Sequence, residues 1–135
     1  MKLYIDKEVV GKSLPESYKV PERFKIFRYA EIRKKQREPE GWFIVRFQLR
    51  HMDVKKNQWF SLLPMLVLVR FKGFRSKYWL MDEASNTCMG VYRWQTEEDA
   101  KRYAQSIAMK FMRMRSVEGS VSYQVGKGSQ PICEF

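Results

Sequence analysis

The chain has 135 residues, of which 44% are hydrophobic, 15% aromatic and 30% charged, and its formal net charge is +11. This length predicts one domain with a core of its own, and the composition excludes a disordered or fibrous protein. The positive charge favours anionic partners in general, without naming one.

The N-terminal region, residues 1–40, reads as an extension laid across the main domain. A short strand is expected at residues 2–5, followed by loop signals at Gly11, Pro15 and Pro21. Proline suits the first position of a helix, and Phe24 and Phe27 begin a one-sided apolar spacing after it. This pattern predicts a helix over residues 21–37.

The main domain, residues 41–125, begins with a strand over residues 41–52. Its alternate residues form two different faces: one is wholly apolar (Phe43, Val45, Phe47 and Leu49) and the other is mixed (Trp42, Ile44, Arg46, Gln48 and Arg50). Residues 57–72 are too apolar for an exposed strand and predict a buried helix that ends at Gly73. Pro64 inside this segment argues for a kink or a later start.

The next elements are a hairpin, a helix and a last strand. Residues 74–82 and 87–94 are strands around the turn EASN, and residues 96–115 form a helix that Thr96 caps. Acidic residues in its first turn and basic residues in its last turn complement the helix dipole. Its apolar stripe consists of Ala100, Tyr103, Ala104, Ile107, Ala108 and Phe111. A strand over residues 120–125 and a tail, residues 126–135, complete the chain.

The order strand, helix, strand, strand, helix, strand predicts an α+β, ferredoxin-like fold in which both helices cover one face of an antiparallel sheet. The apolar face of the first strand belongs under these helices. The mixed face, with residues such as Trp42 and Arg46, then lies on the open side of the sheet. Because an exposed face of this kind is unusual for a monomer, we expect a homodimer packed sheet to sheet, or a ligand cavity there.

Residues 73–106 also resemble a known family. Gly73, the strand Lys77-Tyr78-Trp79, the strand Gly90-Val91-Tyr92 and the helix start at residues 96–99 carry the resemblance. They are similar to the dimeric α/β-barrel proteins related to antibiotic-biosynthesis monooxygenases, particularly the YdhR-like monooxygenases. The resemblance spans about residues 41–125. It implies a homodimer whose two sheets form a barrel, with a pocket in each subunit.

The same fold carries cofactor-free oxygenases, haem-degrading enzymes, isomerases, decarboxylases and non-catalytic members, so it does not choose among them. The haem-degrading relatives have an iron-binding histidine on the second helix, and residues 96–115 contain none. Haem degradation is therefore disfavoured. The prediction is an enzyme without a tightly bound cofactor.

Lys77 and Trp79 are the preferred pocket residues. A desolvated lysine can hold an anionic substrate or an enolate, and tryptophan can stack on an aromatic ring. Arg46 and Arg50 can bind a carboxylate or phosphate in bidentate fashion. The alternative is that these cations form salt bridges across a dimer interface, for instance to Asp82 or Glu83. The further candidates for lining the cavity, with core packing as their alternative, are Trp42, Gln48, Tyr92, Trp94 and Tyr123.

The single histidine and the two cysteines indicate little chemistry. His51 is a candidate general base, although its position in the strand also fits a structural role. Cys88 and Cys133 have no metal-ligand or disulfide spacing, so a small buried side chain and a residue in a mobile tail are expected, in a reducing compartment. A metal site is not expected. Without a signal-peptide pattern or a membrane-length apolar run, a cytoplasmic protein is expected.

Three functions remain open. The first is a monooxygenase-like small-molecule enzyme that acts on an aromatic or polyketide-like anion. The second is a non-catalytic ligand-binding or structural homodimer. The third, a basic nucleic-acid-binding module, is disfavoured because residues 1–40 carry 11 basic and 7 acidic side chains and the remaining positive charge is equally dispersed.

Overall fold

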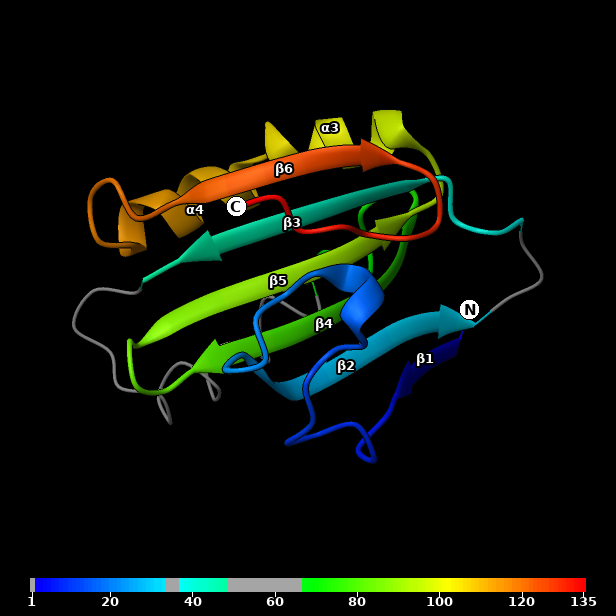
Figure 1. The fold of residues 1–135 in the computed structure, drawn as a ribbon. Helices are drawn as coiled ribbons and strands as arrows, with labels where there is room; N and C mark the ends of the chain where they lie inside the picture. Colours follow the sequence, from blue (N-terminus) through cyan, green and yellow to red (C-terminus); the bar gives the residue numbers. More distant parts are fainter. Residues whose placement is uncertain (1, 34–36, 49–66) are drawn as a thin grey trace.

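The computed structural model describes residues 2–33, 37–48 and 67–135 of the chain. Its centre is one antiparallel sheet of six strands in the order β1-β2-β4-β5-β3-β6 (Figure 1). The strands are β1 (Lys2–Ile5), β2 (Lys25–Arg33), β3 (Gly41–Phe47), β4 (Phe74–Asp82), β5 (Thr87–Trp94) and β6 (Ser122–Lys127). A 3-10 turn, η1 (Glu16–Tyr18), precedes β2, and α3 (Glu97–Ala104) and α4 (Ile107–Arg115) connect β5 to β6. The predicted α+β, ferredoxin-like architecture is confirmed.

The predicted hairpin of β4 and β5 has the expected bounds. Asn86, with φ of +55°, completes the turn, and Asp82 pairs with Thr87. The strand predicted for residues 41–52 is confirmed up to Phe47. Most of the helix predicted for residues 57–72 lies outside the described residues. Its expected end does not, since Gly73 has φ of +84°, a backbone conformation that glycine adopts without a steric penalty.

The helix predicted for residues 21–37 is wrong, because residues 25–33 form strand β2. A register irregularity between Ile26 and Arg28 explains the misleading pattern. Ile26 belongs to the core on one side of the sheet, whereas Ala30 and Ile32 belong to the core on the other side. A bulge that moves the apolar residues from one face to the other converts a period of two into a spacing that resembles a helix.

The N-terminal region is therefore part of the sheet. β2 pairs with both β1 and β4, so these two N-terminal strands extend the same sheet that the rest of the chain forms. The expected mobile tail is also wrong: Pro131 and Cys133 are buried, and the Cys133 amide donates a hydrogen bond to the Tyr18 carbonyl at 2.8 Å. Residues 9–26 and the C-terminal segment therefore pack together on one face of the sheet.

This face is the one expected to be open. Its core, here called the outer core, is built from β3, β4 and β5 together with residues 9–26 and the C-terminal segment. Its buried members are Leu14, Tyr18, Val20, Phe24, Ile26, Trp42, Ile44, Leu80, Met89, Val91 and Cys133. Trp42 is only 8% exposed and Ile44 is fully buried. The premise of a bare face that needs a second subunit is therefore wrong, because the chain covers it with its own residues.

The second core, here called the helix-side core, lies between the opposite face and the helices. Its buried members are Ala30, Ile32, Phe43, Val45, Leu68, Phe74, Trp79, Tyr92, Trp94, Ala100, Tyr103, Ala104 and Met109. Phe43 and Val45 lie under the helices as predicted. α3 packs on β3, β5 and β6, which places Tyr103 over the centre of the sheet.

The single helix predicted for residues 96–115 is instead two. Ser106 accepts a hydrogen bond from the Met109 amide at 3.4 Å and so caps a second helix, α4. The break changes which side chains face the sheet. Ala100, Tyr103 and Ala104 are buried as expected, but Ile107 is 82% and Phe111 54% exposed.

Replacing Thr96 with alanine is expected to lower the free energy of unfolding by about 1 kcal/mol. The Thr96 side chain accepts a hydrogen bond from the Asp99 amide at 3.1 Å and donates one to the Asp99 carboxylate at 2.9 Å. Urea unfolding measures the loss. Thr96→Ser retains both contacts and should be close to wild type, whereas equal losses for serine and alanine would contradict the capping role.

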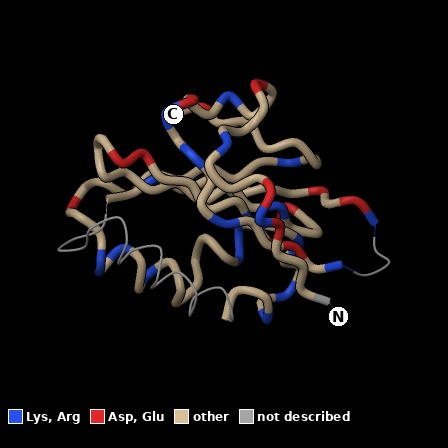
Figure 2. The backbone as a smooth tube through the Cα atoms, turned by 90° about the horizontal axis from the view of Figure 1, so that it is seen from below, with Lys and Arg blue, Asp and Glu red and all other residues tan. Residues whose placement is uncertain are grey.

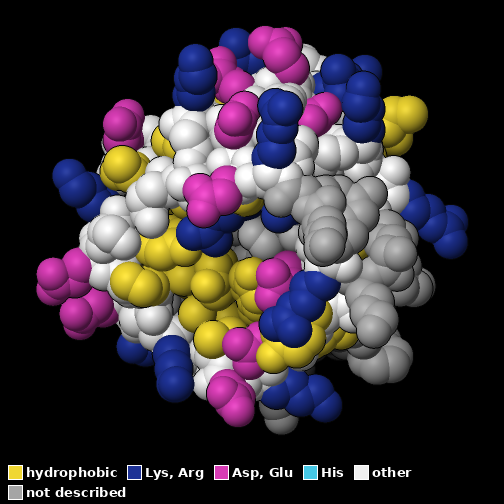
Figure 3. Space-filling view, turned by 90° about the vertical axis from the view of Figure 1, so that its right-hand side faces the viewer, with side chains coloured by type: hydrophobic (Ala, Val, Ile, Leu, Met, Phe, Trp, Pro, Cys, Tyr) yellow, Lys and Arg dark blue, Asp and Glu magenta, His cyan; other side chains and the backbone are white. Residues whose placement is uncertain are grey.

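The described residues include no helix long and apolar enough to cross a membrane. Lys and Arg are spread over several parts of the backbone (Figure 2). On the face shown in Figure 3 they are interleaved with Asp and Glu around a hydrophobic centre. On this face the described residues form no continuous basic surface of the kind that the nucleic-acid alternative expects.

Candidate active site

The candidate site is built around Lys77, near the middle of β4. Lys77 pairs with Tyr92 across the hairpin, so both side chains project from the same face of the sheet. The Lys77 Nζ donates a hydrogen bond to the Tyr92 hydroxyl at 2.6 Å. That hydroxyl lies 3.2 Å from the hydroxyl of Tyr103, which α3 contributes. One amine and two phenols thus form a continuous hydrogen-bonded chain inside the helix-side core.

Aromatic rings surround the amine. The Lys77 Nζ lies 4.4 Å from the Trp79 ring centroid and 4.3 Å from that of Tyr92. The neighbouring strand leaves room for this arrangement at Gly90, where a Cβ atom would lie 3.1 Å from Lys77 Cε and 2.8 Å from Tyr92 Cε1. A side chain at position 90 would therefore push the amine or the phenol out of place.

The surroundings of Lys77 disfavour its charged form. Lys77 is only 8% exposed to solvent, and it makes no ion pair among the residues that the structure describes. Burial, followed by the positive charge of Arg28, lowers the pKa of Lys77 to about 7, and Cys88 opposes this shift. A buried lysine without a carboxylate partner is rare in folded proteins and typical of functional sites.

The two phenols remain protonated at neutral pH. Burial raises the pKa of Tyr103 to about 12. Burial, reinforced by the neighbouring Tyr103, raises the pKa of Tyr92 well above its usual value. Each hydroxyl can therefore donate one proton to a hydrogen bond while accepting another.

Trp94 adds an unpaired donor to the same cluster. Its ring is stacked 6.2 Å from that of Tyr92 and lies 5.0 Å from that of Tyr103. The indole N–H is buried and has no hydrogen-bond partner within the described part of the chain. Buried polar groups are normally paired, so an indole donor without a described partner, on a ring that stacks on Tyr92, favours a ligand oxygen as its acceptor.

The predicted site residues separate onto the two faces of the sheet. Lys77, Trp79, Tyr92 and Trp94 come together in the helix-side core, and Tyr123 packs at its border, 5.5 Å from the Phe43 ring. Trp42 and Arg46 lie on the opposite face, away from Lys77. His51 and Arg50 lie outside the described residues. The expected grouping of Lys77 and Trp79 with the mixed face of β3 is therefore wrong.

The residues on that opposite face have structural partners. Trp42 covers Gly126, where a Cβ atom would lie 2.0 Å from the indole ring. The Arg46 guanidinium lies 4.9 Å from the ring of Phe135. Trp42 thus fills the outer core, and Arg46 contacts the C-terminal residue of its own chain.

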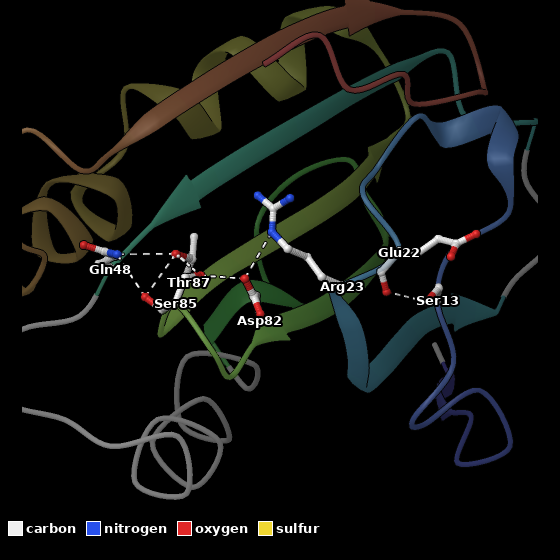
Figure 4. Close-up of polar contacts among 7 residues, drawn as sticks. All are labelled: Ser13, Glu22, Arg23, Gln48, Asp82, Ser85 and Thr87. Carbon is white, nitrogen blue, oxygen red and sulfur yellow. Dashed lines mark hydrogen bonds and ion pairs between the residues drawn. The ribbon is translucent and has the colours of Figure 1, made fainter.

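Gln48 and Asp82 hold the end of the hairpin (Figure 4). The Gln48 amide donates to the Ser85 carbonyl at 3.0 Å, and Ser85 donates to the Asp82 carboxylate at 2.6 Å. Asp82 also forms an ion pair with Arg23 at 3.1 Å. The Ser85 hydrogen bond is the largest cause that lowers the pKa of Asp82, and the Ala84 backbone amide and the Arg23 charge act in the same direction. Asp82, suggested as an ion-pair partner across a dimer interface, thus has its partner within the chain.

A separate groove of about 930 Å³ lies beside the end of α4 and the start of β6, with Arg113 and Tyr123 among its lining residues. It is open to solvent, and Lys77 does not line it. We place the candidate site at the Lys77 cluster because that cluster holds a desolvated amine and an unpaired donor.

No group of three or more His, Cys, Asp or Glu side chains suited to a metal ion occurs in residues 2–33, 37–48 and 67–135.

Comparison with solved structures identifies two proteins with this fold. One is an uncharacterized ferredoxin-fold protein from Listeria monocytogenes related to antibiotic biosynthesis monooxygenases, with a TM-score of 0.60 and 11% identity over 83% of this chain and 65% of the other. The second is a monooxygenase-like protein from Listeria innocua, with a TM-score of 0.59 and 12% identity over 78% of this chain and 63% of the other. This chain therefore shares the ferredoxin-like fold.

The match to this monooxygenase-related fold confirms the resemblance read from residues 73–106 at the level of fold. The chain spans less than two thirds of the length of both structures. No protein-family model matches the sequence, and no curated protein matches it.

Proposed function

We propose that this protein is a monooxygenase-like small-molecule enzyme that binds an aromatic or polyketide-like anion at Lys77 without a tightly bound cofactor. One observation carries the proposal: a buried amine, with its pKa lowered to about 7, is hydrogen-bonded to a phenol between two aromatic rings. The unpaired indole N–H of Trp94 supports it. The shared fold agrees with the proposal, although that fold also carries other activities.

Lys77 would act first as a base and then as a counter-ion. With a pKa of about 7, a large share of the amine is neutral at neutral pH and can accept a proton from an acidic C–H or phenol group. The resulting ammonium stabilises the enolate or phenolate beside it. The Trp79 ring, which lies beside the amine, is the surface on which a planar substrate would stack.

The anion then reduces molecular oxygen, which is the co-substrate. When an activated CH₂ group becomes a carbonyl, its two C–H bonds supply four electrons and two protons. One oxygen atom remains in the new carbonyl and the other leaves as water. Lys77, once protonated, returns its proton to the departing oxygen and is neutral again.

Two earlier expectations belong to this proposal. His51 remains a candidate second base that lies outside the described residues. A homodimer also remains a prediction, but its interface would have to lie away from the face that residues 9–26 cover. The non-catalytic alternative would use the same Lys77 cluster for ligand binding alone.

Replacing Lys77 with methionine is expected to abolish ligand binding and to lower oxygen consumption at least about 100-fold, the usual contribution of a positioned base. Thermal shift with phenolic acids and 1,3-diketones measures binding, because a ligand of the folded state raises the melting temperature. An oxygen electrode measures turnover with each compound that binds.

Lys72→Met is the matched control, because Lys72 is exposed on the turn before β4. It should bind and turn over ligands like the wild type. If ligands bind but no oxygen is consumed, the protein is a ligand-binding protein and not an enzyme. If no acid or diketone stabilises the wild type, or if Lys77→Met binds equally well, the proposed site is wrong.

A further inference from the structure

The Lys77 amine has the surroundings of a nucleophile as well as those of a base. We infer that Lys77 binds conjugated carbonyl compounds covalently, as an imine between its Nζ and the carbonyl carbon. This inference rests on the proposed function, because it places the ligand at the same site. It goes further by assigning the substrate class, a 1,3-dicarbonyl, and a covalent mode of binding.

The first support is the position of the amine. Its Nζ is held by a single described hydrogen bond, to Tyr92, and no described carboxylate neutralises it. An ammonium paired to a carboxylate keeps its proton and is a poor nucleophile. A lysine desolvated in an apolar pocket and close to another cation is, by contrast, activated for attack on carbonyl carbon.

Arg28 supplies the neighbouring cation. It lies on β2, and its guanidinium is 5.7 Å from the centroid of the Trp79 ring, the ring that also contacts the Lys77 amine. The two positive groups therefore share one indole. Burial, together with the repulsion from Arg28, lowers the pKa of Lys77 to about 7, so that the unprotonated amine is available at neutral pH.

The reaction needs no additional reagent. The amine lone pair forms the C–N bond, and the proton that the nitrogen loses ends on the former carbonyl oxygen. Loss of that hydroxyl with a second proton from nitrogen gives the imine and one water. The Tyr92 hydroxyl, 2.6 Å from Nζ, can carry these protons between nitrogen and oxygen.

A 1,3-dicarbonyl fits the cluster better than an isolated ketone. Its imine isomerises to a planar, conjugated enaminone that suits the flat faces of Trp79 and Tyr92, both in contact with the amine. Its second carbonyl oxygen is an acceptor, and the Trp94 indole N–H, on a ring that stacks on that of Tyr92, is a donor without a described partner. The same unit occurs in polyketide-like compounds, the class proposed above.

The test uses acetylacetone as the probe with the full chain at neutral pH. We expect one adduct, with a mass gain equal to the probe minus one water, and peptide mapping should place it on Lys77. Lys77→Arg should lose this adduct, whereas Lys72→Arg should keep it. The rate of adduct formation should rise with pH and level off about one pH unit above 7 in the wild type.

The outcomes separate this inference from the proposed function. Adducts spread equally over exposed lysines, or an unmodified Lys77, would overturn covalent binding. If phenolic acids still stabilise the wild type but not Lys77→Met, the proposed function survives and Lys77 acts only as a base and counter-ion. If neither acids nor diketones bind, both proposals fail. If Lys77→Arg does not fold because its guanidinium is larger than the amine, Lys77→Met serves in its place as the variant that should lose the adduct.

Discussion

Phe24→Ala is expected to lower the free energy of unfolding by about 3–5 kcal/mol, the usual cost of truncating a fully buried phenylalanine. Phe24 has no exposed surface and belongs to the outer core with Ile44 and Leu80. Its loss would leave a cavity between the N-terminal segment and the sheet. Urea or guanidinium unfolding measures the change directly.

Val10→Ala is the control for this prediction, because Val10 lies in the same segment and is 47% exposed. It should change stability by less than about 0.5 kcal/mol. If Phe24→Ala had an equally small effect, residues 9–26 would be an appendage and the face of the sheet would be available to a second subunit. Size-exclusion chromatography with light scattering on the same variants reports that association.

Lys77→Met is expected to change how stability depends on pH. The pKa of Lys77 is about 7 in the folded protein and 10.5 when the side chain is free, so the unfolded chain binds the extra proton between these values. Below pH 7 both states are charged, and the folded protein bears the full cost of burying the charge. As pH rises from 7 towards 10, the wild type gains up to about 1.4 kcal/mol per pH unit relative to the variant.

The measurement is the difference in unfolding free energy between wild type and Lys77→Met at several values from pH 7 to 10. Taking the difference cancels other groups that titrate alike in both proteins. The measurement stops near pH 10. Above this pH tyrosines ionise in the unfolded chain, whereas Tyr92 and Tyr103 have raised pKa values in the folded protein and stay protonated. The free energy of unfolding then falls with pH for a reason unrelated to Lys77. Parallel stability curves for the two proteins would show that Lys77 is not desolvated. Lys72→Met should run parallel to the wild type.

The central pair of the site was within reach of the sequence. The hairpin bounds and the four-residue turn at residues 83–86 already imply that Asp82 faces Thr87, and counting outward from that pair sets Lys77 opposite Tyr92. Lys77 and Trp79 were found because charge and aromatic residues alternate in one strand. They were assigned to the wrong face because the phase of β4 relative to β3 depends on β5, which lies between them.

Tyr103, Arg28 and Gly90 were missed for different reasons. Tyr103 was interpreted as one member of the apolar stripe of a helix, and only the packing of α3 on the sheet brings its hydroxyl to Tyr92. Arg28 lies on β2, which read as a helix because of the bulge after Ile26. Gly90 has an ordinary place in a strand, and its importance comes from the side chains that close over it.

The sequence by itself determined the elements whose signals are local. The β4–β5 hairpin, the cap at Thr96 and the glycine at position 73 all depend on neighbours within a few residues. Only the tertiary structure decided that residues 9–26 cover the second face and that an amine lies among phenols and rings under α3. Such contacts depend on which distant segments exclude water from each other, and no local pattern records that choice.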